Sequence, residues 1–147
     1  MGSRLGLTTV QVLILRRGGI ASTAQLLASG EEWEGINIAA NYRRIQHICK
    51  GWWAMPGIAA ELVAARRAGG QLACISALTF RGLASDSVSS DHALHVLVPH
   101  SASRRRKSTA DGRPIVYHFA RRAPSGRAPV VSAAVAREQM RSCTALT

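Results

Sequence analysis

Glycines cut the first part of the chain into short segments, and this punctuation limits what the chain can fold into. Glycine pairs or glycine turns follow each apolar run, at Gly18-Gly19, Gly30, Gly51, Gly57 and Gly69-Gly70. A membrane-spanning helix needs roughly 20 consecutive apolar residues, whereas the longest apolar stretches lie near 5–15 and 58–65 and are much shorter. We therefore expect several small helices and strands, and no membrane segment.

Three short helices followed by a β-hairpin are predicted for the N-terminal part. The helices start at capping residues and end at glycines or polar residues. They are 10–17 after Thr8 or Thr9, 24–28 after Ser22 or Thr23, and 32–41 after an acidic run. The runs 44–49 and 52–55 alternate in polarity around Lys50-Gly51, which is typical of a hairpin. This order is the outline of a winged helix-turn-helix, although other small α+β domains share it.

The remainder of the chain predicts a helical and β extension with a tail. We expect helices over 58–67 and 71–80, then an antiparallel pair of strands over 93–98 and 115–119, and a further helix within 130–141. The predicted fold class is α+β. The predicted divisions are a winged helix-turn-helix over 1–57, a helix-helix-hairpin extension over 58–122, and a basic, partly disordered or helical tail over 123–147.

The charge distribution favours a polyanionic partner. The formal net charge is +11, and residues 101–147 carry ten basic and two acidic side chains. A field of this kind attracts nucleic acid, although a solvated basic tail without a ligand is the simpler alternative. The three cysteines are odd in number and widely spaced, which argues against a disulfide framework. We expect a soluble cytoplasmic protein.

Catalytic and metal patterns are not complete in the sequence. His92, His95 and His100 suggest a metal site, but no cysteine or acidic pair completes a four-ligand spacing near them. Paired nuclease carboxylates, a phosphate-binding glycine loop and a nucleophile elbow are not found. The sequence therefore predicts no enzyme, no metal site and no cofactor. Trp33, Trp52 and Trp53 are expected to pack in the core and hairpin rather than stack on a ligand.

Two stretches resemble a known family. The first is GIASTAQLLASG at 19–30 with GWWAMPG at 51–57, and the second is GQLACISAL at 70–78 with LHVLVP at 94–99. Over roughly 10–119 the chain resembles AbiEi-type antitoxins of abortive-infection toxin–antitoxin systems, whose N-terminal winged helix also precedes small endonuclease domains. The resemblance implies DNA binding and control of the protein's own operon. A prophage or immunity repressor of the same module fits equally.

The mapped motif predicts a DNA interface in which 32–41 is the recognition helix. Its candidate contacts are Ser22, Thr23, Asn37, Asn41, Arg43, Arg44, His47, Lys50, Arg104, Arg105 and Arg106. Asparagine can pair with adenine, and the basic residues suit phosphate. We expect a homodimer on an inverted-repeat operator. Two alternatives stay open: a protein-binding antitoxin whose 58–119 region engages a toxin partner, and the remnant of an endonuclease.

Overall fold

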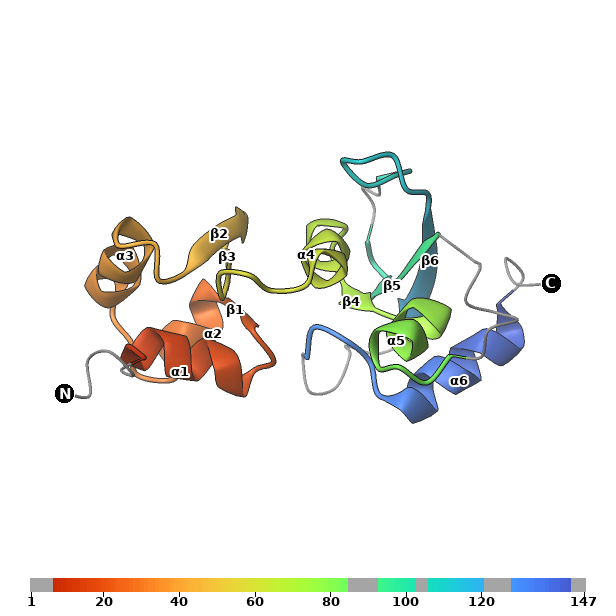
Figure 1. The fold of residues 1–147 in the computed structure, drawn as a ribbon, viewed down its shortest axis with the longest axis horizontal. Coiled ribbons are helices and arrows are strands. Elements are labelled where there is room, and N and C mark those ends of the chain that lie inside the picture. Colours follow the sequence, from red (N-terminus) through yellow and green to blue (C-terminus); the bar gives the residue numbers. More distant parts are fainter. Residues whose placement is uncertain (1–6, 85–92, 103–105, 121–127, 144–147) are drawn as a thin grey trace. The chain divides into compact units, whose positions relative to one another are not determined.

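The computed structural model describes residues 7–84, 93–102, 106–120 and 128–143. Within these ranges the protein is a mixed α+β chain with six helices and two three-stranded sheets (Figure 1). It divides into two compact units, Met1–Ala59 and Ala60–Thr147. No helix in the described ranges is both long enough and apolar enough to cross a membrane.

The first unit contains three helices and one antiparallel sheet. In chain order its elements are α1 (Thr9–Arg16), β1 (Ile20–Ser22), α2 (Thr23–Ala28), α3 (Trp33–Asn41), β2 (Gln46–Cys49) and β3 (Trp52–Ala54). The strand order is β1-β3-β2. The three predicted helices and the hairpin are confirmed, and the short strand β1, which the sequence reasoning missed, pairs with β3.

Polar side chains at the helix starts explain why α1 and α2 begin where they do. Thr8 caps α1 and Ser22 caps α2, and each forms a capping box with a glutamine three residues later, Gln11 and Gln25. Each box satisfies two backbone N–H groups that a helix start leaves open. Gln11 also donates from Nε2 to the carbonyl of Arg44 at 2.9 Å, and this bond joins α1 to the segment after α3.

The core of the first unit takes one side of each helix. Its buried residues are Val10, Ile14, Ala21, Leu26, Ile36, Ala39 and Ile45. Trp53 of β3 and Met55, which follows β3, pack against this cluster. Because α3 contributes only Ile36 and Ala39, most of its other side chains face away from the core.

The second unit consists of a three-stranded sheet and three helices. In chain order its elements are α4 (Ala60–Arg67), β4 (Gln71–Leu72), α5 (Cys74–Phe80), β5 (Leu94–Pro99), β6 (Ile115–Ala120) and α6 (Ala133–Ser142). The strand order is β4-β5-β6. One buried cluster joins α5 and α6 to Leu97 of β5, and Val116 of β6 packs against it.

Two predictions for the second unit are wrong. The strands β5 and β6 run parallel, with Leu94 beside Ile115, and not as an antiparallel hairpin. Alternating polarity does not encode strand direction, and the connection from 100 to 114 is long enough to return the chain to the same end of the sheet. The predicted helix over 71–80 starts with strand β4, and the helix itself begins only at Cys74.

The described residues near the C-terminus, 128–143, pack against other elements of the second unit. The predicted helix within 130–141 is present as α6, which packs against α5 (Figure 1). Val131 is buried in the same cluster as α5, and its carbonyl accepts hydrogen bonds from the Arg81 side chain at 2.9 and 3.1 Å. Gln71 donates from its side chain to the carbonyl of Ala128. These contacts join residues far apart in sequence, so the sequence analysis did not predict them.

Candidate functional site

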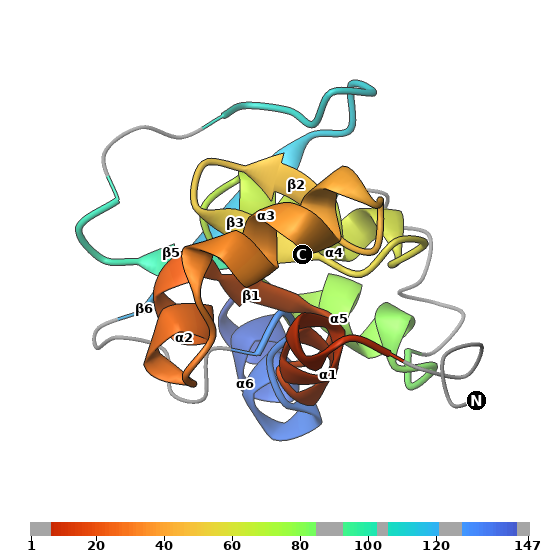
Figure 2. The ribbon, with the colours of Figure 1, turned by 90° about the vertical axis from the view of Figure 1, so that its left-hand side faces the viewer.

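The outward face of α3 is polar and exposed. Ile36 and Ala39 face the core, whereas Asn37 and Asn41 lie on the solvent side, one helical turn apart. Ile38 is also exposed, but it lies on the side of α3 that faces α1. In Figure 2, which faces the first unit, α2 and α3 run in clearly different directions. The two predicted base-reading asparagines are therefore brought together on one accessible surface.

The end of α3 holds an arginine in a conformation that usually belongs to glycine. Arg43 has φ 57°, and the amides of Arg43 and Arg44 donate to the carbonyls of Ala40 and Ala39. This is a Schellman-type helix end, whose left-handed position is normally occupied by glycine. Both arginine side chains are exposed. The strained turn thus sets two cations directly beside the asparagine face.

The hairpin contributes one exposed cation and one packed histidine. Lys50 is exposed at the turn between β2 and β3. His47 on β2 is exposed as well, and its ring lies edge-on to Trp53, with ring centroids 5.1 Å apart. Trp53 itself donates from Nε1 to Thr23 Oγ1 at 2.9 Å, which connects the hairpin to the start of α2.

Ser22 and Thr23 have structural tasks at the start of α2. Ser22 is the N-cap, and its side chain accepts the amide of Gln25 at 3.0 Å. Thr23 is only 9% exposed, and its hydroxyl accepts from Trp53. A buried, bonded hydroxyl is poorly placed for phosphate, so the predicted DNA contact by Thr23 gains no support from its position. Trp33, expected in the core, is instead 55% exposed at the start of α3.

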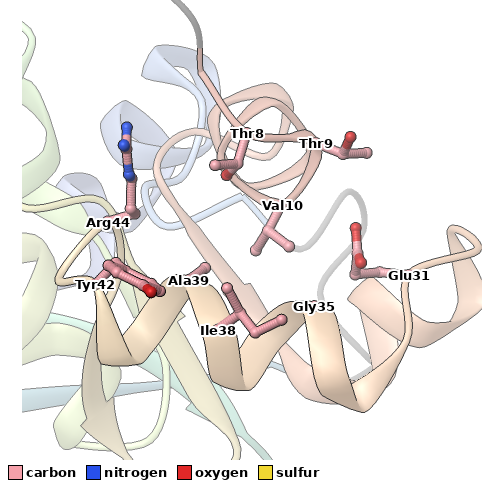
Figure 3. Close-up of a pocket in the computed structure, with 9 residues that line it drawn as sticks. All are labelled: Thr8, Thr9, Val10, Glu31, Gly35, Ile38, Ala39, Tyr42 and Arg44. Carbon is pink, nitrogen blue, oxygen red and sulfur yellow. The ribbon is translucent and has the colours of Figure 1, made fainter. Parts of the chain in front are cut away.

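A cavity of about 420 Å³ lies between α1 and α3. Figure 3 shows Val10 of α1 pointing toward α3, with Glu31 and Arg44 toward opposite ends of the cavity. Glu31 precedes α3 and extends its side chain over the first turn of that helix, where its carboxylate occupies the space that a side chain at Gly35 would need. Glu34 remains exposed on α3. Of the three acids at the start of α3, Glu31 therefore turns toward the helix, while Glu32 and Glu34 face solvent.

The second predicted basic cluster is described only in part. Arg104 and Arg105 lie outside the described residues. Arg106 is exposed, and its carbonyl accepts from the Tyr117 hydroxyl at 2.7 Å. The nearby turn is held by a short side-chain hydrogen bond that Thr109 donates to Asp111. This bond is the largest cause of the lowered pKa of the Asp111 carboxyl.

The second unit contains a cluster of two histidines and two cysteines that the sequence reasoning missed. It comprises Cys74, His95, His118 and Cys143, whose potential ligand atoms all lie within 4.8 Å of one another. The distance from His95 Nδ1 to His118 Nε2 is 3.2 Å, and Cys143 Sγ lies 3.8 Å from each of these nitrogens. Three of the four residues are buried, and His118 is partly buried.

The strand register explains how the two histidines meet. His95 stands beside Val116, and His118 stands beside Leu97, in the parallel pair of β5 and β6. Residues two apart on a strand share a face, so both histidines lie on the face that carries Leu97 and Val116. That face packs against α5, which begins at Cys74, and against α6, which Cys143 directly follows.

Local interactions hold the cluster in place. Cys74 has φ 54°, and its amide donates to Gln139 Oε1 of α6 at 2.8 Å. Ser76 Oγ accepts the amide of His95 at 2.9 Å. Burial, and secondarily the neighbouring His95, lowers the pKa of His118 to about 4. The lowered pKa favours the neutral form of the His118 ring, which is the form in which histidine binds metals.

The sequence analysis did not identify this cluster, because it considered only ligands close to one another in the chain. His92 lies outside the described residues, and His100 is exposed at the end of β5. The other members of the cluster are distant in sequence from His95: Cys74 starts α5, His118 lies on β6 and Cys143 follows α6. The available signal was a histidine at an inward position of each of two apolar strands, since a buried polar side chain requires a partner.

No protein-family model matches the chain, and no curated protein matches it.

Proposed function

We propose that this chain is a sequence-specific DNA-binding protein that represses transcription, and that its first unit is a winged helix-turn-helix. The element order α1, β1, α2, α3, β2, β3 and the antiparallel order β1-β3-β2 support this assignment. In this reading α2 and α3 form the helix-turn-helix, α3 is the helix that enters the major groove, and the β2–β3 hairpin is the wing.

One observation carries the proposal. Helix α3 buries Ile36 and Ala39 and turns Asn37 and Asn41 toward solvent, immediately before the exposed Arg43 and Arg44. Asparagine amides can make paired hydrogen bonds to the adenine edge in the major groove. Arginines at the end of the same helix suit phosphate oxygens on the flanking backbone. A single surface thus offers both base reading and backbone positioning.

The other candidate contacts have supporting roles in the proposed DNA interface. Lys50 and His47, which are exposed on the hairpin, would contact phosphates of the adjacent DNA backbone. Arg106 of the second unit is a further exposed cation. Thr23 is left out because it is buried, and Ser22 serves as the α2 cap. A single module reads few base pairs, so two copies are expected on an inverted repeat. The resemblance to AbiEi-type antitoxins suggests that this operator lies upstream of the protein's own gene.

Fluorescence anisotropy tests the proposal with the full chain. Labelled DNA from upstream of the gene is compared with a scrambled duplex of equal length and composition, across a series of salt concentrations. We expect the upstream DNA to bind at least ~1000-fold more tightly than the scrambled duplex. Equal affinities that fall together as salt rises would instead mean that the net charge of +11 acts alone. That outcome would remove the repressor assignment.

A further inference from the structure

The Cys74–His95–His118–Cys143 cluster has the dimensions of a tetrahedral metal site. Typical bonds from zinc to cysteine sulfur and histidine nitrogen imply tetrahedral edges of about 3.3 Å between nitrogens and about 3.6 Å between nitrogen and sulfur. The structure has 3.2 Å between the ring nitrogens and 3.8 Å from Cys143 Sγ to each of them. The fourth atom, Cys74 Sγ, lies within 4.8 Å of the others. Three of the four donor atoms are therefore within a few tenths of an ångström of coordination spacing, and Cys74 Sγ is close enough to complete the set after a small side-chain movement.

The donor types select the metal. Two thiolates and two neutral imidazoles are the ligand set of closed structural zinc sites. Magnesium and calcium prefer oxygen ligands, and the cluster contains no carboxylate. Cys74 and His95 are fully buried and Cys143 is 6% exposed. A substrate could not reach these sulfurs, so the arrangement suits a structural ion better than a catalytic one.

The surrounding structure orients the ligands. Cys74 keeps a backbone conformation that is unfavourable for a residue with a side chain, and Gln139 of α6 holds its amide in place. The amide of His95 is held by Ser76 in the same way. Hydrogen bonds to residues around the ligands commonly hold the ligands of metal sites in position. Here the contacts come from the same elements that carry the cysteines.

We propose that the second unit binds one Zn²⁺ ion through Cys74, His95, His118 and Cys143. The ion joins four elements: the start of α5, the two parallel strands β5 and β6, and the end of α6 (Figure 1). Each thiol loses its proton on binding, and each histidine donates a neutral ring nitrogen. The site closes the second unit around its C-terminal helix, and it is independent of the proposed DNA interface on α3.

Metal analysis of the purified full chain tests this proposal directly. The protein is expressed in zinc-supplemented medium, purified under reducing conditions without chelator, and measured by native mass spectrometry and elemental analysis. We expect about one zinc per chain, with X-ray absorption showing two sulfur ligands at about 2.3 Å and two nitrogen ligands at about 2.0 Å. This readout needs no variant and does not depend on any variant folding.

Matched variants separate the proposed ligands from other residues of the same type. We expect Cys143→Ser and His118→Asn to lower zinc affinity at least about tenfold, while Cys49→Ser and His100→Asn keep it unchanged. Cys49 lies in the first unit, and His100 is exposed at the end of β5. Gln139→Ala, which removes the partner of the Cys74 amide, should weaken binding less than loss of a ligand.

Three results would overturn the proposal. The first is a chain that carries no zinc and takes up none when reduced apoprotein is titrated with Zn²⁺. The second is a bound zinc whose X-ray absorption shows no sulfur ligand, or that survives in both ligand variants. The third is a Cys74–Cys143 disulfide that persists when the protein is purified under reducing conditions. The cluster would then be a covalent link beside a hydrogen-bonded histidine pair.

Discussion

Replacing Arg43 with glycine is expected to stabilise the first unit and weaken DNA binding at the same time. Arg43 has φ 57° at the end of α3. A residue with a side chain is destabilised by about 1–2 kcal/mol in this left-handed region. Glycine has none of that strain, but its larger loss of backbone entropy on folding costs about 0.5–1 kcal/mol. The difference predicts a gain of about 0.5–1 kcal/mol for Arg43→Gly.

The tryptophans make this measurement specific to the first unit. Trp33, Trp52 and Trp53 are the three tryptophans of the chain, and all lie before residue 60. Their emission during urea unfolding therefore reports the first unit and not the second. Arg43→Ala is the matched control, because alanine removes the charge but retains the strain. We expect the urea midpoint to increase for Arg43→Gly and to remain near wild type for Arg43→Ala.

The binding half of the same experiment uses salt dependence. If Arg43 contacts one phosphate, either substitution should reduce the slope of log affinity against log salt by about 0.9. Arg43→Lys should keep most of the slope. A glycine variant no more stable than the alanine variant would refute the strain argument, and an unchanged salt slope in both would refute the phosphate contact.

Four further predictions address other parts of the structure. Gly70→Ala should destabilise the second unit by about 3 kcal/mol, as measured by circular dichroism, because its methyl group would collide with the Leu97 carbonyl. Thr23→Val removes the acceptor of Trp53 Nε1 and should cost the first unit about 1–3 kcal/mol in urea unfolding, whereas Thr9→Val at an exposed position should cost little. Glu34→Gln should raise affinity for upstream and scrambled DNA alike by at most about fivefold, because unit charges 4 Å apart interact by about 1 kcal/mol in water; a change in their ratio would instead indicate base contact by Glu34. Removal of the proposed zinc by a chelator should lower the stability of the second unit by about 4 kcal/mol, relative to protein in free zinc at about 1,000 times the dissociation constant. Tryptophan-monitored unfolding of the first unit should not change.

Local patterns in the sequence predict the first unit well. Capping residues such as Thr8 and Ser22 act on amides within three residues, and the hairpin turn at Gly51 joins adjacent strands. These interactions are short in sequence, so residue type and spacing are enough to predict them. The polar positions Asn37 and Asn41 follow from helical periodicity in the same way.

The second unit depends on contacts that sequence patterns do not encode. Strand alternation is identical for parallel and antiparallel pairs, so it could not show that Leu94 stands beside Ile115. The histidine–cysteine cluster joins Cys74 to Cys143 across nearly half the chain. Local spacing rules therefore assign His95 to a core strand but cannot supply its partners.

Backbone conformation was the other unpredicted feature. Among the described residues, the two non-glycine residues with positive φ are Arg43 and Cys74. Arg43 lies beside the proposed DNA-reading face, and Cys74 lies in the proposed zinc site. Strained residues concentrate at functional sites, and each of these has a property that glycine lacks: a guanidinium in one case and a thiol in the other. Residue type alone predicts neither strained position.

The most direct test of DNA reading by α3 is the affinity ratio between upstream and scrambled DNA for wild type and for the Asn37→Ala/Asn41→Ala double variant. Both side chains are exposed, so the double variant should fold normally by tryptophan emission. We expect its ratio to fall by at least about tenfold, because each well-made asparagine–adenine pair contributes about 1–3 kcal/mol of discrimination, while the salt slope stays the same. An unchanged ratio in a folded double variant would contradict the account, because base reading would then not reside on this face of α3.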